Sequence, residues 1–201
     1  MITHMTDMSN KPKLIAICGK SCSGKDTLAK AFIRVLKSEK RGKSITRVVS
    51  CTTRPPRPKE KDGVDYFFVT PEKFYELAES KQLLDYTEFR GWHYGHPKAS
   101  INSDYNIAIF DPDGIKKLVK YQNEYDITIV YLNAKARVRL ARAHDRENKW
   151  HLEYFRRLFT DWKDFRNIHR ILSKFPNVYE HNKNSTMSIL DIARYVAVFF
   201  V

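Results

Sequence analysis

Apolar and polar residues alternate in blocks along this chain, and the blocks predict strands and helices in turn. An apolar run at 13–18 is rich in strand-forming residues, and residues 25–40 place four apolar side chains on one helical face: Leu28, Phe32, Val35 and Leu36. Further strands are predicted at 47–49, 66–69, 106–110, 127–132 and 177–180. Further helices are predicted from residue 70, at 111–118, 134–142, 152–172 and 185–200. Strands that alternate with helices indicate a parallel sheet covered on both faces.

Residue type marks two of the helix starts and one unusual segment. Thr70 and Asp111 each precede a proline, which is typical of an N-cap followed by the first helical residue. The almost continuously apolar run at 127–132 fits a strand that is buried on both faces. Residues 66–94 combine many aromatics with short strand candidates, and we expect a small inserted lobe there.

Composition favours one folded domain. The 201 residues are 42% hydrophobic and 13% aromatic, which is enough to build a core and excludes a disordered chain. No run approaches the roughly 20 apolar residues of a membrane span, and the polar start lacks a secretory pattern. We therefore expect a disordered tail at 1–11, a cytoplasmic location and no membrane partner. Three cysteines without a CxxC pair (Cys18, Cys22 and Cys51) argue against disulfides and a structural zinc site.

The loop between the first strand and the first helix carries the clearest chemical signal. Its sequence, GKSCSGKDT at 19–27, has the GxxxxGK spacing of a phosphate-binding loop. Its backbone N–H groups and the following helix start attract phosphate, and Lys25 reaches the β- and γ-phosphates. Asp26 stands where the motif has a Mg²⁺-binding Ser or Thr, so Asp26, Thr27 or both are expected to organise the Mg²⁺ shell. The expected ATP-binding residues are Gly19, Lys20, Ser21, Cys22, Ser23, Gly24, Lys25, Asp26 and Thr27.

A second anion site is predicted where two arginines follow a strand. Arg54 and Arg57 lie in TTRPPRP, whose prolines favour an extended path with about three residues per turn, so both side chains should project to one side. Paired arginines suit a phosphate monoester, which accepts bidentate hydrogen bonds. Pro55 and Pro58 also form a PxxP motif that could bind another protein, but the segment lies inside the predicted fold rather than in a tail.

These motifs, in this order, resemble the guanylate kinases. TTRPPRP is followed by DGVDYFFV at 62–69 and LDYTEFRGWHYG at 84–95, and with the phosphate loop the resemblance covers most of 13–115. It implies an α/β, three-layer P-loop NTPase fold with a parallel sheet, formed by one domain at 12–201. Within that domain it implies a core at 12–50 and 104–201, an NMP-binding lobe near 51–103 and a helical lid near 143–151.

The resemblance also implies roles for single residues. The nucleoside monophosphate would be bound by Ser50, Arg54, Arg57, Tyr66, Asp85, Tyr94 and Asp111. Ser50 and Asp85 would read the base edge, and Asp111 has an equal claim as a plain helix N-cap. The transferred phosphoryl group would be stabilised by three cations, Lys25, Arg146 and Arg157. Arg146 and Arg157 also fit a solvated basic face.

The implied activity is transfer of phosphate from ATP, with Mg²⁺, to GMP or dGMP. The chain departs from the family pattern, because Asp85 stands in place of glutamate and His96 in place of serine or threonine. The family's pair of acidic residues before the next helix is also reduced to Asp111 alone. A phage-type deoxynucleoside monophosphate kinase of broader base specificity, whose loop looks similar to SGKDT, is therefore a second interpretation. A non-catalytic protein-binding module would lack the phosphate loop that this chain retains. The net charge of +13 also fits a nucleic-acid binder, although no nucleic-acid motif is present. The sequence indicates nucleotide ligands and gives nothing on protein partners.

Overall fold

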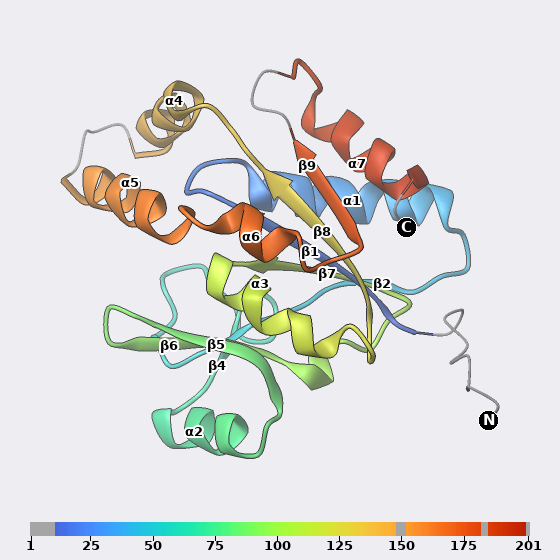
Figure 1. Ribbon diagram of the computed structural model, residues 1–201. Helices are drawn as coiled ribbons and strands as arrows, with labels where there is room; N and C mark the ends of the chain where they lie inside the picture. The colour runs from blue at the N-terminus through green and yellow to red at the C-terminus, as the bar shows by residue number, and fades with distance from the viewer. Residues whose placement is uncertain (1–10, 148–151, 182–184, 200–201) are drawn as a thin grey trace.

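A five-stranded parallel sheet forms the centre of the molecule (Figure 1). The computed structural model describes residues 11–147, 152–181 and 185–199. The strands stand in the order β2-β7-β1-β8-β9, and every neighbouring pair is parallel. Their bounds are β1 Lys13–Gly19, β2 Ile45–Arg47, β7 Tyr105–Phe110, β8 Asp126–Leu132 and β9 Asn177–His181. The parallel α/β fold predicted from the alternating blocks is confirmed.

Helices cover both faces of this sheet, which gives three layers (Figure 1). Side chains of β1 alternate between the faces. Ile15 and Ile17 pack beneath α1 (Lys25–Glu39) and α7 (Ile189–Phe199). Leu14 and Ala16 face the side of α3 (Pro112–Leu118) and α6 (Ile168–Leu172). Two short 3-10 turns, Lys98–Ser100 and Val119–Tyr121, complete the connections. No described helix is long and apolar enough to cross a bilayer.

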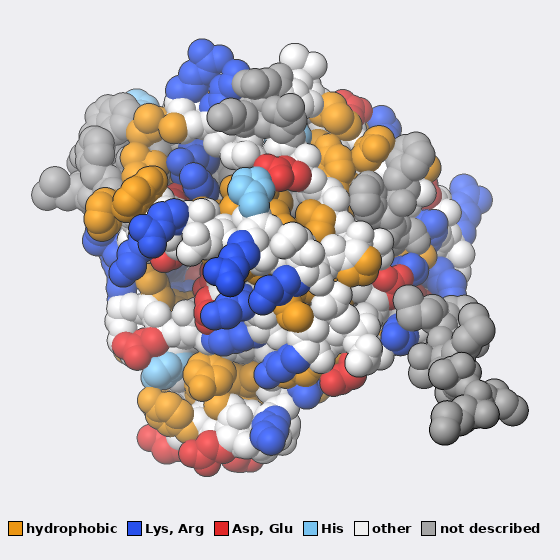
Figure 2. All heavy atoms as spheres, in the orientation of Figure 1, with side chains coloured by type: hydrophobic (Ala, Val, Ile, Leu, Met, Phe, Trp, Pro, Cys, Tyr) orange, Lys and Arg blue, Asp and Glu red, His pale blue; other side chains and the backbone are white. Residues whose placement is uncertain are grey.

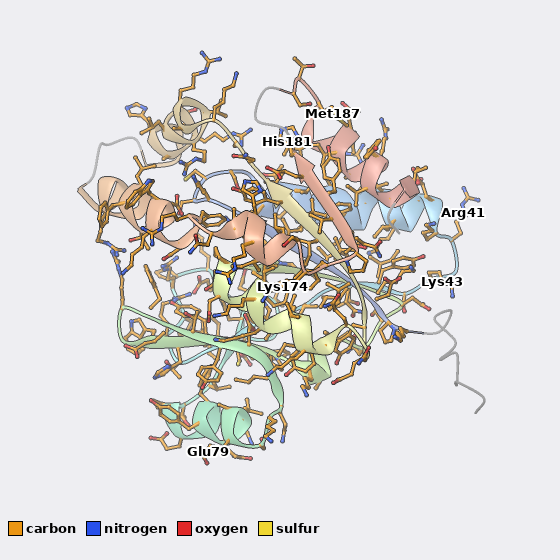
Figure 3. All side chains as sticks on the ribbon, in the orientation of Figure 1. Arg41, Lys43, Glu79, Lys174, His181 and Met187 are labelled. Carbon is orange, nitrogen blue, oxygen red and sulfur yellow. The ribbon has the colours of Figure 1, made fainter. Side chains whose placement is uncertain are left out.

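A second, smaller sheet lies within the segment predicted as the inserted lobe. Its strands are β3 (Cys51–Thr52), β4 (Phe67–Phe68), β5 (Leu83–Phe89) and β6 (Trp92–Pro97), in the order β4-β3-β6-β5. Strands β5 and β6 form a hairpin whose turn, Arg90-Gly91, has φ values of 58° and 74°, as a tight type I′ turn requires. Helix α2 (Pro71–Glu79) packs on this sheet through Phe74, and Glu79 marks its outer end (Figure 3).

Three predicted elements differ clearly in extent from those of the structure. The helix predicted at 152–172 is interrupted: α5 covers Leu152–Asp164, and α6 begins only at Ile168. The chain turns at Phe165, whose ring is buried and lies 6.0 Å from the ring of Tyr131. The strand predicted at 47–49 is β2, which begins two residues earlier and ends at Arg47. The helix predicted at 134–142 is α4 (Ala136–Glu147), which begins two residues later and ends five residues later than predicted. The predicted tail lies outside the described residues, apart from Lys11.

Candidate functional site

A cavity of about 850 Å³ lies between the phosphate loop, the β5–β6 hairpin and α5. Lys25 lines it on one side and Tyr94 on the other. A smaller cavity of about 160 Å³ adjoins it. Four residues line both cavities: Thr87, Tyr94, Ile109 and Asp111. The two cavities therefore adjoin, and together they extend from the phosphate loop to the base of the small sheet.

The phosphate loop begins where β1, the middle strand, reaches its carboxyl end. Gly24 adopts a φ of 102° directly before α1, a conformation that side chains rarely adopt. Lys25 follows it, and its Nζ donates to the carbonyls of Gly19 at 2.6 Å and Lys20 at 3.1 Å. Burial lowers the pKa of Lys25, and the nearby acidic groups Cys18 and Asp161 offset part of that effect. The amine is thus held inside the loop, at the position from which it would meet a phosphate.

An ion pair that the sequence did not reveal holds this loop in place. Asp161 of α5 accepts from the backbone N–H of Ser21 at 3.0 and 3.1 Å, and from its hydroxyl at 3.1 Å. The same carboxylate lies 2.8 Å from Nη1 of Arg139 in α4, and Asp161 and Arg139 are 8% and 5% exposed. Arg142 adds a hydrogen bond of 2.7 Å to the carbonyl of Ser23. Helices α4 and α5 are therefore both fastened to the phosphate loop.

Asp26 and Thr27, the predicted metal residues, lie at the exposed start of α1. The carboxylate of Asp26 accepts from Nη2 of Arg47 at 3.1 Å and is 73% exposed, so it stands at the surface rather than inside the loop. Within the described ranges, no group of three or more His, Cys, Asp or Glu side chains is arranged to hold a metal ion. The magnesium role of Asp26 and Thr27 stays a prediction.

The two predicted phosphate-binding arginines have different surroundings. Arg54 is only 9% exposed, and its Nη2 lies 2.9 Å from both carboxylate oxygens of Glu60. Its guanidinium also lies 5.5 Å from the ring centre of Tyr66, and the rings of Tyr66 and Tyr94 lie 6.1 Å apart. Arg57 is exposed, and its backbone N–H donates to Glu60 at 2.8 Å. Arg54 therefore lies next to the tyrosines that line the smaller cavity, and its ion pair with Glu60 holds it there.

The smaller cavity brings together five of the seven residues predicted for the acceptor nucleotide, whereas Arg54 and Arg57 line neither cavity. Its walls include Ser50, Tyr66, Asp85, Tyr94 and Asp111. Asp111 is the N-cap of α3, since its Oδ1 accepts from the N–H of Gly114 at 2.6 Å. Burial raises the pKa of Asp111. The hydrogen bond from Gly114 offsets part of this rise, and the nearby charge of Asp85 adds to it. The N-cap interpretation is confirmed, and its position leaves the carboxylate at the cavity as well.

The lid arginines are only partly placed. Arg146 lies in α4 and Arg157 in α5, but their side chains lie outside the described part of the chain, as do residues 148–151 of the predicted lid. Arg156 is described, and its guanidinium lies 5.4 Å from the ring centre of Phe89 at the hairpin tip. This contact joins α5 to the small sheet across the larger cavity.

Part of the positive charge lies away from the cavity. Figure 2 shows Lys and Arg side chains gathered over the face that carries α3. Lys98 and Lys120 each place their amine within 5 Å of the ring centre of Tyr121, at 4.8 and 4.9 Å. Lys117 does the same with Tyr86 at 4.9 Å. These lysines therefore lie over the buried ring of Tyr121 and over the exposed ring of Tyr86, away from the phosphate loop.

A parallel sheet between two layers of helices, with a GxxxxGK loop between its middle strand and the next helix, defines a P-loop nucleotide-binding protein. The sequence model of guanylate kinase matches residues 11–169, so the chain belongs to the guanylate kinase family. The match covers the phosphate loop, the small sheet, α4 and α5.

Individual relatives agree with this assignment. Guanylate kinase of Ehrlichia ruminantium (strain Gardel) is 30% identical over 131 residues, which are 63% of this chain and 60% of the relative. Guanylate kinase of Thermosynechococcus vestitus is 44% identical over 95 residues, 47% of each chain. The aligned part thus spans less than two thirds of these relatives. The crystal structure of guanylate kinase from Anaplasma phagocytophilum has the same fold, with a TM-score of 0.59, 19% identity and coverage of 93% of this chain and 83% of that one.

Proposed function

We propose that the protein transfers the γ-phosphoryl group of ATP to GMP or dGMP and so forms GDP or dGDP. One observation carries the proposal: two adjoining cavities have the Lys25 loop at one end and Tyr66, Tyr94 and Asp85 at the other. A donor and an acceptor nucleotide bound there would bring their phosphates together. Phosphoryl transfer needs little beyond such positioning and neutralisation of charge.

Each end of the cavity has a proposed task. The phosphate loop and Lys25 would bind the β- and γ-phosphates of ATP, and Arg146 and Arg157 would neutralise charge on the moving group. Arg54, Arg57, Tyr66 and Tyr94 would hold the acceptor phosphate, and the second anion site would then be completed by the release of Glu60 from Arg54. Ser50 and Asp85 lie at the far end, where the base would reach.

Mg²⁺ would accompany ATP. Mg²⁺ usually keeps several waters and takes one or two carboxylates together with substrate phosphates. Asp26 and Thr27 follow Lys25 at the exposed start of α1, and the Asp26 carboxylate would have to leave Arg47 to join such a sparse donor set. When bound, the metal would neutralise charge on the phosphate oxygens. A Mg²⁺ titration of Asp26→Ala tests this proposal, because an unchanged Mg²⁺ dependence would exclude Asp26.

The rival interpretations receive less support. A protein-binding module has no use for an intact phosphate loop with a buried lysine and a carboxylate clamp on its backbone. A kinase of broader base specificity shares the whole mechanism, and it differs only at the base end of the smaller cavity.

A coupled assay for ADP formation, run with GMP, dGMP, AMP, CMP, UMP and dTMP, tests the proposal. GMP and dGMP should be the best acceptors. Lys25→Met should lower turnover on the order of 10³-fold, as expected when a transition-state charge contact is removed. Lys30→Met is the matched control, since Lys30 is exposed on the same helix and should leave turnover unchanged. The proposal fails if no acceptor is phosphorylated by a folded protein.

A further inference from the structure

Asp85 and His96 form a buried pair at the base end of the smaller cavity. They lie on the adjacent strands β5 and β6, and are 7% and 8% exposed. Oδ1 of Asp85 lies 2.6 Å from Nδ1 of His96 and also accepts from its backbone N–H at 3.1 Å. The imidazole packs against the ring of Phe110, with ring centres 4.2 Å apart. Three contacts therefore fix the orientation of the imidazole.

The second oxygen of Asp85 is also close to protein. A Cβ added to Gly114 would lie 2.5 Å from Oδ2, so this oxygen rests against the start of α3. Guanine offers two donors side by side, N1–H and the 2-amino group, and a carboxylate reads them best with two available oxygens. Oδ1 of Asp85 already accepts two hydrogen bonds from His96, and Oδ2 lies against the start of α3. It is poorly arranged to read guanine directly.

His96 is better placed for that task. An ionised carboxylate only accepts hydrogen bonds, so its contact with Nδ1 assigns the proton of the neutral ring to Nδ1 and leaves Nε2 as an acceptor. His96 lines the smaller cavity together with Ser50, Tyr66 and Tyr94. We propose that His96 reads the acceptor's base through Nε2, and that Asp85 is the positioning residue that fixes the ring and its tautomer. This inference rests on the proposed kinase function.

The chemistry of one acceptor atom differs from that of a free carboxylate. Nε2 takes one N–H from the base, whereas a free carboxylate would take two from guanine and repel bases that present an acceptor there. The base would therefore be recognised through a single hydrogen bond, with Ser50 as the neighbouring polar group. The preference for guanine over adenine should accordingly be modest, and it should depend on His96.

Two substitutions separate reading from positioning. His96→Asn keeps a donor where Nδ1 stands, so the buried carboxylate stays paired, but it removes Nε2. We expect its kcat/KM for GMP to fall about tenfold, the equivalent of one hydrogen bond. Its KM for ATP and its melting temperature should be unchanged. His93→Asn is the matched control, because His93 lies on the same strand, bonds Tyr75 at 2.9 Å and lines neither cavity.

The outcomes distinguish this inference from the proposed function. If the wild-type protein phosphorylates GMP and His96→Asn has the same acceptor profile, the base-reading role is overturned while the kinase stands. An equal loss with every acceptor would also overturn it, because a structural role acts that way. A wild-type protein that phosphorylates no monophosphate refutes the proposed function itself. If His96→Asn does not fold, the ¹⁵N signal of Nε2 in the wild-type protein decides: it should shift on GMP binding, and an unshifted signal refutes the inference.

Discussion

The carboxylate clamp on the phosphate loop gives the most demanding prediction. Asp161→Ala removes every hydrogen bond that fastens Ser21 to α5 and leaves Arg139 without its ion-pair partner. Arg139 is 5% exposed, and its Nε has no hydrogen-bond partner among the described residues. Within the same part of the chain, its guanidinium would keep a 3.3 Å hydrogen bond to the carbonyl of Ser21. The buried guanidinium of Arg139 would thus lose the charged partner that offsets most of the cost of removing it from water.

The expected decrease in the free energy of unfolding follows from the removal of only one partner of this ion pair. Breaking a buried pair by removing one partner costs about 3–5 kcal/mol, and the burial of both groups places this pair within that range. Replacing both partners with apolar residues, as in Arg139→Met with Asp161→Leu, should cost less than Asp161→Ala alone. Asp161→Asn keeps the size of the side chain and one acceptor, and we expect roughly 1–2 kcal/mol.

Urea unfolding and calorimetric titration with ATP measure the two consequences. Asp161→Asn should bind ATP more weakly, because the loop backbone is no longer fixed by a charged acceptor. Asp164→Ala is the control for stability on the same helix, because Asp164 is exposed and its removal should change stability little. Lys163→Ala, exposed on the same helix and not a lining residue of the larger cavity, is the control for ATP binding. A stability loss below about 1 kcal/mol for Asp161→Ala would refute the reasoning.

Three further outcomes are expected. Gly114→Ala should raise the KM for the acceptor roughly tenfold or more, with the KM for ATP unchanged in steady-state kinetics, because its Cβ would lie 2.5 Å from an oxygen of Asp85. Burial raises the pKa of Cys18 and of Cys51 to about 12, so neither thiol should react with a thiol reagent at neutral pH until the protein is denatured. Hydrogen bonds from the residue before β2 lower the pKa of Asp104 from 3.8 to about 2. That contribution to stability is present above pH 3.8 and is lost as the pH falls towards 2, so Asp104→Asn should flatten the acid-unfolding curve in this window.

Local patterns made the core predictable. The spacing of 19–27 placed the loop between β1 and α1, and Asp111 before a proline identified the N-cap of α3. Both features depend on residues within a few positions of each other. The break between α5 and α6 could not be found this way, because the buried positions Phe165, Ile168 and Leu172 continue a helical spacing across it. Periodicity records which face is buried, and that face does not change at the turn.

The contacts that complete the site are distant in sequence. Asp161 and Ser21 are 140 positions apart, and no local pattern pairs an aspartate in an amphipathic helix with an N–H group of a distant loop. The pair of Asp26 with Arg47 depends in the same way on the end of β2. Glu60 could have been found, since it follows Arg57 by three residues in a stiff segment and a carboxylate there readily accepts from the arginines.

Both proposed anion sites already hold oxygens of the protein itself. Lys25 donates to two loop carbonyls, and Arg54 holds the carboxylate of Glu60. A phosphate that arrives at either site would therefore exchange hydrogen bonds rather than add them, and its net gain would come from its greater charge. At Arg54 the exchange displaces a carboxylate, so an acceptor with a dianionic phosphate should compete far better than one with a single negative charge. The same exchange would keep Arg54 paired while the cavity is empty, which avoids a buried, uncompensated guanidinium next to Tyr66 and Tyr94.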